Sequence, residues 1–282
     1  MQHKDAMGLL NKIVSGGQTG ADRAALDVAI KFNIPHGGWI ARGRRTESGP
    51  LPDFYNLKEM ATRDYPARTR QNILDSDGTV IIARGSLTGG SALTYALAQK
   101  TCKWVCRINL LEQDIFEAAL ILYDFIIDQG IRVLNVAGPR AGHDPDIYYD
   151  VKVILTAVLY LDFLETEEDS WPVDQMIDAR FDFPTSFDSV KQVTQALEQS
   201  LTLRGKTLIA RSQAHQMVGI YFALLEYVQL SLDLDEKNSG LFKHLAKGRT
   251  LKEYTPEDAV MELLKKLKTR LSKNFQLRVV SS

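Results

Sequence analysis

Lys12-Ile13-Val14-Ser15-Gly16-Gly17-Gln18-Thr19-Gly20-Ala21-Asp22 is the stretch that decides the fold. A short β-branched run is followed by glycines and then by residues 23–30, which favour a helix. The predicted order is therefore strand, glycine loop, helix. At such a junction, bare backbone N–H groups meet the positive end of a helix dipole, which favours binding of an anion.

A second glycine loop, residues 85–91, follows another β-branched run, Thr79-Val80-Ile81-Ile82-Ala83. Within it, Thr88-Gly89-Gly90-Ser91 stands directly before a predicted helix at 92–98. Its hydroxyl groups can donate to phosphate-like oxygens or can simply cap the helix. Either loop alone could be an ordinary structural turn. We expect the two loops to face each other across one ligand site, and valine at Gly17 or Gly90 to abolish binding with only a modest loss of stability.

Strands and helices alternate along the first half of the chain. We expect strands at 12–15, 79–83, 104–108 and 132–136, and helices at 20–32, 92–98, 112–128 and 146–163. Residues 33–76 form a long connection whose first half shows no clear period, with a helix expected within 62–74. The alternation predicts an α/β fold with a doubly wound parallel sheet. In such sheets ligands bind beyond the carboxyl ends of the strands, where Asn135 and Gly138 also lie.

The acidic run Glu165-Thr166-Glu167-Glu168-Asp169 marks a domain boundary. Beyond it β-branched runs nearly vanish. Helices are expected from a capped start within 184–190 to about 201, over 213–233 and over 255–271. Thr255 and Pro256 fit the N-cap and first position of the last helix. We therefore predict a ligand-binding domain at 1–165 and a small all-α domain at 170–282.

Composition excludes several classes of function. The chain has 282 residues and a net charge of −1, so nothing global favours nucleic acid or an acidic membrane. No apolar run approaches the roughly 18 residues of a membrane span, and no signal-peptide pattern is present, so we expect a cytoplasmic protein. Cys102 and Cys106 fit a structural role, with a metal or redox pair as the alternative, and the histidines show no metal-ligand spacing.

A basic segment supplies candidate ligands for an anion. Arg42-Gly43-Arg44-Arg45 is followed by Arg63, Arg68 and Arg70, and arginine forks suit phosphate oxygens. A solvated surface or ion pairs with nearby carboxylates would explain the same residues. Trp39 could stack on a flat heterocycle or could pack in the core. Asp22 is favourable in a first helical turn for helix reasons alone.

Together these motifs resemble the molybdenum cofactor carrier protein family over residues 12–164. The likeness is carried by 12–27, by 37–39, 43–45 and 49–52, by 63–65, 68–69, 72 and 75–77, by 87–94 and by 134–140. The family belongs to a Rossmann-like group that includes phosphoribohydrolases and the DNA-processing protein A domain. The resemblance implies a Rossmann-like sheet, a homo-oligomer, and binding of the molybdenum cofactor (molybdopterin), another phosphorylated pterin or a nucleotide-like ligand.

The chain departs from the family pattern in places. Ile40-Ala41-Arg42 stands where the family has Cys-Pro-Lys, and 141–144 differs after Gly-Pro-Arg. The catalytic glutamate of the phosphoribohydrolase motif has no counterpart in 88–94, which counts against that activity. The second half faintly resembles a small helical domain of unknown function.

We therefore expect a binding or carrier protein in preference to an enzyme. Its two glycine loops would hold a small phosphorylated ligand. Its expected partners are a second copy of itself and molybdoenzymes or cofactor-insertion proteins, with no nucleic acid and no membrane. A nucleotide-processing hydrolase and a nucleotide sensor with a helical relay domain remain alternatives. The candidate cofactor-binding residues are Gly16, Gly17, Gln18, Thr19, Gly20, Asp22, Arg23, Trp39, Arg44, Arg45, Arg68, Thr88, Gly89, Gly90, Ser91, Asn135 and Gly138.

Overall fold

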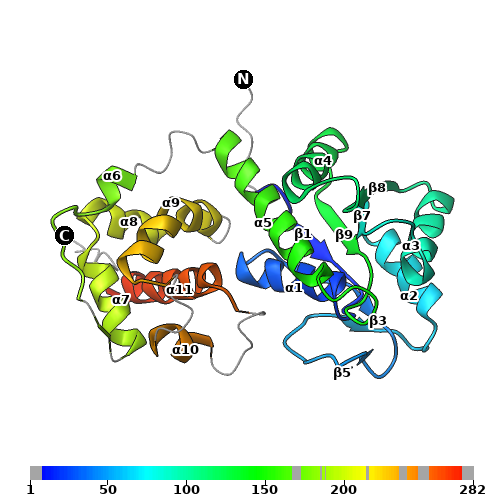
Figure 1. Cartoon of the computed structure of the whole chain (residues 1–282), viewed down its shortest axis with the longest axis horizontal. Helices are drawn as coiled ribbons and strands as arrows, with labels where there is room; N and C mark the ends of the chain where they lie inside the picture. The colour runs from blue at the N-terminus through cyan, green and yellow to red at the C-terminus, as the bar shows by residue number, and fades with distance from the viewer. Residues whose placement is uncertain are drawn as a thin grey trace, which may run out of the picture. The chain divides into compact units, whose positions relative to one another are not determined.

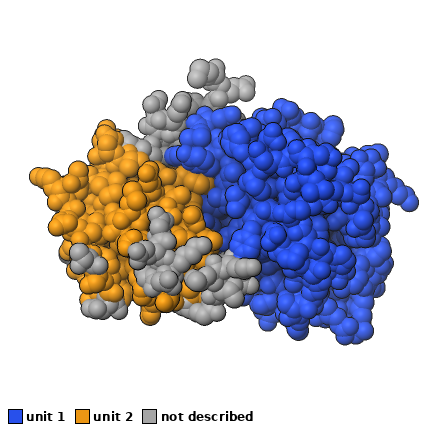
Figure 2. Space-filling view, in the orientation of Figure 1, with its two compact units in different colours: residues 1–165 blue, residues 166–282 orange. Residues whose placement is uncertain are grey.

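The structure is a computed structural model that describes residues 8–166, 173–184, 186–187, 189–213, 216–234, 240–246 and 254–274 (Figure 1). The chain divides into two compact units, residues 1–165 and 166–282, which Figure 2 shows in different colours. The first unit carries a parallel sheet, and the described part of the second is helical. Most of the acidic run at 165–169 lies outside the described residues.

A five-stranded parallel sheet forms the centre of the first unit. Its strands are β1 (Lys12–Val14), β2 (His36–Gly37), β7 (Gly78–Ala83), β8 (Trp104–Asn109) and β9 (Val133–Ala137). Their order is β2-β1-β9-β7-β8, so the last strand of the chain lies in the middle. All six residues of β7 are buried, as expected for a parallel strand covered on both faces.

Five helices connect or follow these strands: α1 (Ala21–Lys31), α2 (Tyr65–Leu74), α3 (Gly89–Lys100), α4 (Ile115–Asp128) and α5 (Ile147–Thr166). The step from β1 to β2 and the step from β7 to β8 run in opposite directions across the sheet. Right-handed crossovers therefore place α1 and α3 on opposite faces. Helix α2 packs against α3. The predicted doubly wound, Rossmann-like α/β fold is confirmed.

The segment at 33–76 is more ordered than its sequence indicates. It contains β2, which joins the main sheet, and four further two-residue strands: β3 (Trp39–Ile40), β4 (Arg45–Thr46), β5 (Gly49–Pro50) and β6 (Lys58–Glu59). Strands β3 and β6 pair in parallel, and β4 and β5 form an antiparallel hairpin. Ile40, Leu51, Tyr55 and Leu57 pack on Leu26 of α1. Strands this short give no detectable period, and tertiary packing holds them.

The described part of the second unit contains α6 (Val173–Met176), α7 (Val190–Gln199), α8 (Leu203–Arg211), α9 (Gln216–Ser231), α10 (Gly240–Ala246) and α11 (Pro256–Asn274). Ser189 caps α7 by accepting a hydrogen bond from the N–H of Gln192 (3.3 Å), and α11 begins at Pro256 as expected. Helices α8 and α10 were not predicted. Gly205 weakens the helical signal of α8, and it is required because a Cβ there would lie 2.4 Å from the carbonyl oxygen of Met176.

Candidate functional site

Loop 1, residues 15–20, joins β1 to α1 at the carboxyl edge of the sheet. Gly20 is the N-cap of α1 with a φ of 75°, and a Cβ on it would lie 2.5 Å from the carbonyl oxygen of Pro139. A Cβ on Gly138 would lie 2.5 Å from the carbonyl oxygen of Ile82. These two glycines allow loop 1, the end of β9 and the start of α1 to approach one another closely.

Some N–H groups in and beside loop 1 already donate hydrogen bonds to acceptors of the protein itself. The N–H of Gln18 donates to Asp22 Oδ2 (3.2 Å), and the N–H of Thr19 donates to the Gln18 side chain (3.0 Å). The N–H of Ala21 donates to the carbonyl oxygen of Pro139 (3.2 Å). Not all N–H groups of loop 1 are therefore available to a ligand. Among the described residues, no acceptor takes a hydrogen bond from the buried N–H groups of Gly16, Gly17 and Gly20.

Asp22 and Arg68 form an incompletely satisfied ion pair beside this loop. Burial raises the pKa of the Asp22 carboxyl group, and the nearby Arg68 guanidinium and the N–H of Gln18 oppose that rise. Arg68 Nη1 lies 3.7 Å from Asp22 Oδ2, longer than a good hydrogen bond. Arg68 Nε is buried and has no hydrogen-bond partner. A Cβ on Gly16 would lie 1.7 Å from Arg68 Nη1, so the guanidinium lies directly against the backbone of loop 1.

Loop 2, residues 85–91, leads from β7 into α3 and is more open. Gly89 and Gly90 are exposed, and a Cβ on either would meet nothing within 4 Å. Thr88 is the N-cap of α3, but its side chain makes no capping hydrogen bond. Ser91 is buried, and the hydroxyl of Thr94 donates to the carbonyl oxygen of Gly90 (2.8 Å). The first turn of α3 therefore presents backbone rather than bulky side chains to solvent.

Loop 1 and loop 2 lie at the same edge of the sheet but do not follow neighbouring strands. Strand β9 lies between β1 and β7, so the loops are separated by two strand spacings, about 10 Å. The segment after β9 lies between them, and Arg84 ties that segment to the end of β7 through hydrogen bonds to Asp144 (2.6 and 2.7 Å). A ligand that touches both loops must span roughly this distance.

Glu47 connects the β4–β5 hairpin to loop 1. Its carboxylate accepts hydrogen bonds from the Thr19 hydroxyl (2.6 Å) and from the N–H of Gly142 (3.1 Å). Its own N–H donates to the Gln18 side chain (2.8 Å). The hydrogen bond from Thr19 is the largest cause lowering the pKa of Glu47. Sequence reasoning missed this role because no local pattern links Glu47 to loop 1.

The predicted arginines have different roles. Arg44 donates to the carbonyl oxygens of Leu51 (3.0 Å), Pro52 (2.9 Å), Tyr55 (3.0 Å) and Leu57 (3.2 Å), so its guanidinium organises the chain rather than facing a ligand. We therefore leave it out of the site.

Two further predicted arginines, Arg45 and Arg23, make no hydrogen bond or ion pair with loop 1 among the described residues. Arg45 is exposed on the β4–β5 hairpin. The guanidinium of Arg23 lies 4.9 Å from the ring centroid of Tyr55, and its Nε is buried without a hydrogen-bond partner. Of the predicted arginines, Arg68 has the geometry of an anion receptor.

Trp39 and Asn135 have structural partners. Trp39 Nε1 donates to Asp75 (2.7 Å), and its backbone N–H donates to Asn72 Oδ1 (2.7 Å). Asn135 lies within the sheet, 3% exposed, and donates to the Thr79 hydroxyl (3.1 Å). Trp39 is partly buried, whereas the buried Asn135 has little room for a ligand.

Within the part of the chain that the structure describes, no three His, Cys, Asp or Glu side chains gather so as to hold a metal ion. Among the described helices, none is long and apolar enough to cross a membrane. Cys102 is exposed and Cys106 is buried, both as free thiols.

Comparisons with known proteins identify the family. Residues 13–159 match the profile of cpYpsA, the circularly permutated YpsA SLOG family. A solved structure, described as a "putative molybdenum carrier protein" from Syntrophus aciditrophicus SB, is 50% identical with a TM-score of 0.53. The match covers 55% of this chain and 98% of that chain. No curated protein matches the chain. The predicted resemblance is confirmed, and the chain belongs to the circularly permutated YpsA SLOG family.

Proposed function

We propose that the first unit is a binding or carrier protein for the molybdenum cofactor or a similar phosphorylated heterocycle. One observation carries this proposal: Arg68 lies against the backbone of loop 1 with its Nε buried and unpartnered. An unsatisfied buried donor costs about 1–3 kcal/mol, so the site favours an added anion. The solved relative described as a molybdenum carrier adds support for a carrier role.

The phosphate of the ligand would take Asp22's place as the partner of Arg68. The buried N–H groups of Gly16, Gly17 and Gly20 would supply further donors beside it. An arriving anion raises the pKa of Asp22 further, because like charges disfavour ionisation. Binding would therefore be accompanied by uptake of a proton on the Asp22 carboxylate.

The rest of the ligand would extend toward loop 2. The open first turn of α3 at Gly89 and Gly90 offers backbone N–H groups about 10 Å from loop 1. The hairpin held by Glu47 would close one side of the site. Thr88 and Ser91 flank this turn and would add hydroxyl contacts to polar atoms of the ligand.

Equilibrium dialysis against molybdenum cofactor, released anaerobically from a molybdoenzyme, tests the proposal. The wild-type chain should retain the cofactor, and Arg68→Ala should weaken retention about tenfold or more, since hydrogen bonds to charged groups contribute about 1.5–3 kcal/mol. Arg70→Ala, an exposed arginine on the same helix, is the matched control and should bind normally. Equal binding by both variants, with circular dichroism showing intact folds, would refute the assigned site. Release of free base from nucleoside monophosphates would instead favour a hydrolase.

A carrier must also assemble and deliver its cargo. We propose a homo-oligomer that passes the cofactor to molybdoenzymes or cofactor-insertion proteins. Light scattering and a reconstitution assay with an apo-molybdoenzyme test the two parts separately. A monomer, or failure to restore activity from the loaded protein, would contradict the corresponding part.

A further inference from the structure

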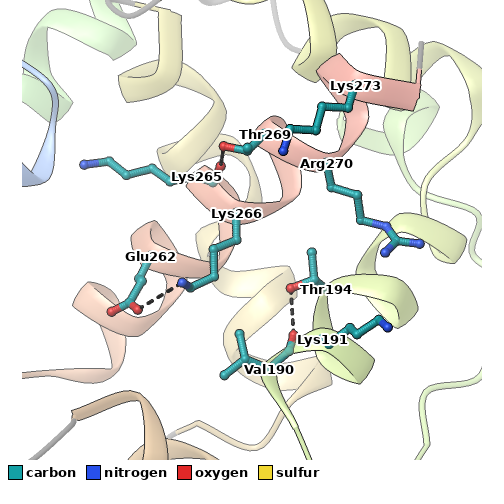
Figure 3. Close-up of a pocket in the computed structure, with 9 residues that line it drawn as sticks. All are labelled: Val190, Lys191, Thr194, Glu262, Lys265, Lys266, Thr269, Arg270 and Lys273. Carbon is teal, nitrogen blue, oxygen red and sulfur yellow. Dashed lines mark hydrogen bonds and ion pairs between the residues drawn. The ribbon is translucent and has the colours of Figure 1, made fainter.

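A groove of about 710 Å³ lies between α7 and α11 in the second unit (Figure 3). The family match ends at residue 159, so this groove is outside it. Five of its lining side chains are cationic and one is a carboxylate: Lys191, Lys265, Lys266, Arg270, Lys273 and Glu262. The whole chain carries a net charge of −1, so this positive groove is a local feature.

The cations differ in how far their charge is already neutralised. Lys266 lies 3.6 Å from Glu262, and Arg270 is paired with Glu198. Lys191 and Lys273 are exposed, and no acidic partner faces either of them among the described residues. Figure 3 shows Lys191 and Arg270 reaching from the two helices toward the same end of the groove, whereas the amino group of Lys265 points away.

The remaining lining indicates what kind of anion fits. The hydroxyls of Thr194 and Thr269 donate to carbonyl oxygens of their own helices, at 2.7 and 2.9 Å, so they do not donate into the groove. Among the described residues, the apolar residue that lines the groove is Val190, and no aromatic ring lines it. This described lining provides neither a stacking platform for a base nor apolar pockets for peptide side chains.

From these features we infer that the groove binds a short, unsubstituted polyphosphate. Ammonium groups act as point charges toward phosphate oxygens and require no planar partner. Single exposed ion pairs contribute little, so a ligand must engage several lysines at once. The volume lies within the usual range for small-molecule sites. This inference is independent of the carrier function proposed for the first unit.

Isothermal titration of the full chain with inorganic triphosphate tests the inference. Affinity should fall in the order triphosphate, pyrophosphate, phosphate, and should drop steeply between about 50 mM and about 300 mM salt because exposed charges are screened. Lys191→Gln and Lys273→Gln should each weaken triphosphate binding about two- to fivefold. Lys243→Gln, an exposed lysine on α10 outside the groove, is the matched control and should change nothing.

Several outcomes would overturn the inference. The first is that triphosphate does not bind at low salt. The second is that Lys243→Gln weakens triphosphate binding as much as the groove variants do. The third is that a hexaglutamate peptide or ATP binds more tightly than triphosphate. Arg68→Ala separates the groove from the site in the first unit, since triphosphate binding to the groove should survive that change. Loss of triphosphate binding in Arg68→Ala alone would assign the anion to the first unit and contradict a groove site. Thermal unfolding of each variant checks that the second unit is intact.

Discussion

At the scale of single residues, the glycines of the two loops have different roles. Close backbone contacts explain why glycine is required at Gly20 and Gly138, because a Cβ atom at either position would lie 2.5 Å from a carbonyl oxygen. Gly17 has a φ of 73°, and its would-be Cβ meets Leu57 and Leu51 at 2.7 and 2.8 Å. Gly17→Val should therefore cost stability as well as binding, contrary to the expectation from sequence. Gly90 has open space and is the position at which binding can be tested without disturbing the fold.

Gly20→Ala and Gly90→Ala form a matched pair. Gly20→Ala should lower the free energy of unfolding by about 2 kcal/mol or more, because alanine is strained at positive φ and its Cβ would meet backbone atoms. Gly90→Ala should leave stability unchanged or slightly higher, because alanine favours a helix. Chemical denaturation measures both values. Equal unfolding midpoints would show that loop 1 can rearrange around a side chain.

Asp22→Asn tests the proton coupling at the same scale. Burial raises the pKa of Asp22 in the free protein, and a bound phosphate should raise it further. Wild-type affinity should therefore rise as pH falls through the window between these two pKa values, and should be lowest above both. Asp22→Asn should bind more tightly at neutral pH and show only the titration of the ligand itself. Identical pH profiles for the two proteins, measured by titration calorimetry, would exclude the coupling.

At the scale of elements, the segment between β2 and α2 depends on Arg44. This residue has a φ of 49° and joins its guanidinium to four backbone carbonyl groups between residues 51 and 57. The same segment carries Leu51 and Leu57, which contact Gly17. Arg44 therefore supports loop 1 indirectly, by holding the segment that carries Leu51 and Leu57.

Arg44→Ala should destabilise the protein by at least about 2 kcal/mol, because four carbonyl oxygens lose a charged donor. The neighbouring exposed Arg45 provides the control, and Arg45→Ala should stay within about 0.5 kcal/mol of wild type. Urea unfolding of both variants gives the comparison. Similar losses at the two positions would indicate that the carbonyl groups are satisfied by water instead.

The sequence predicts elements well where they are long and periodic. The buried run of β7, the amphipathic α4, the capped start of α7 and the start of α11 at Pro256 are all present. The two-residue strands of 36–59 were missed because they depend on distant partners, such as the pairing of Ile13 with His36. Sequence could not separate the roles of Arg44 and Arg68, because each depends on which acceptors the fold brings near. Glu47 was missed for the same reason.

At the scale of the whole molecule, the two units divide the proposed activities. The sheet, both glycine loops and Arg68 belong to the first unit, and the basic groove belongs to the second. We expect a fragment of residues 1–165 to fold alone, since it contains the complete sheet and the helices of the first unit. It should show one cooperative thermal transition, bind the cofactor like the full chain and lack the triphosphate binding of the groove. A fragment without a cooperative transition would show that the first unit needs the second.

The proposed function of the first unit requires it to hold a phosphorylated heterocycle beside Arg68. Native mass spectrometry of the full chain, purified anaerobically from a host that makes the molybdenum cofactor, tests it most directly. We expect a wild-type mass increased by one phosphorylated heterocycle per chain, and an Arg68→Ala protein that is folded but lacks this ligand. A folded wild-type protein that carries no such ligand, and acquires none when incubated with the cofactor, would contradict the account.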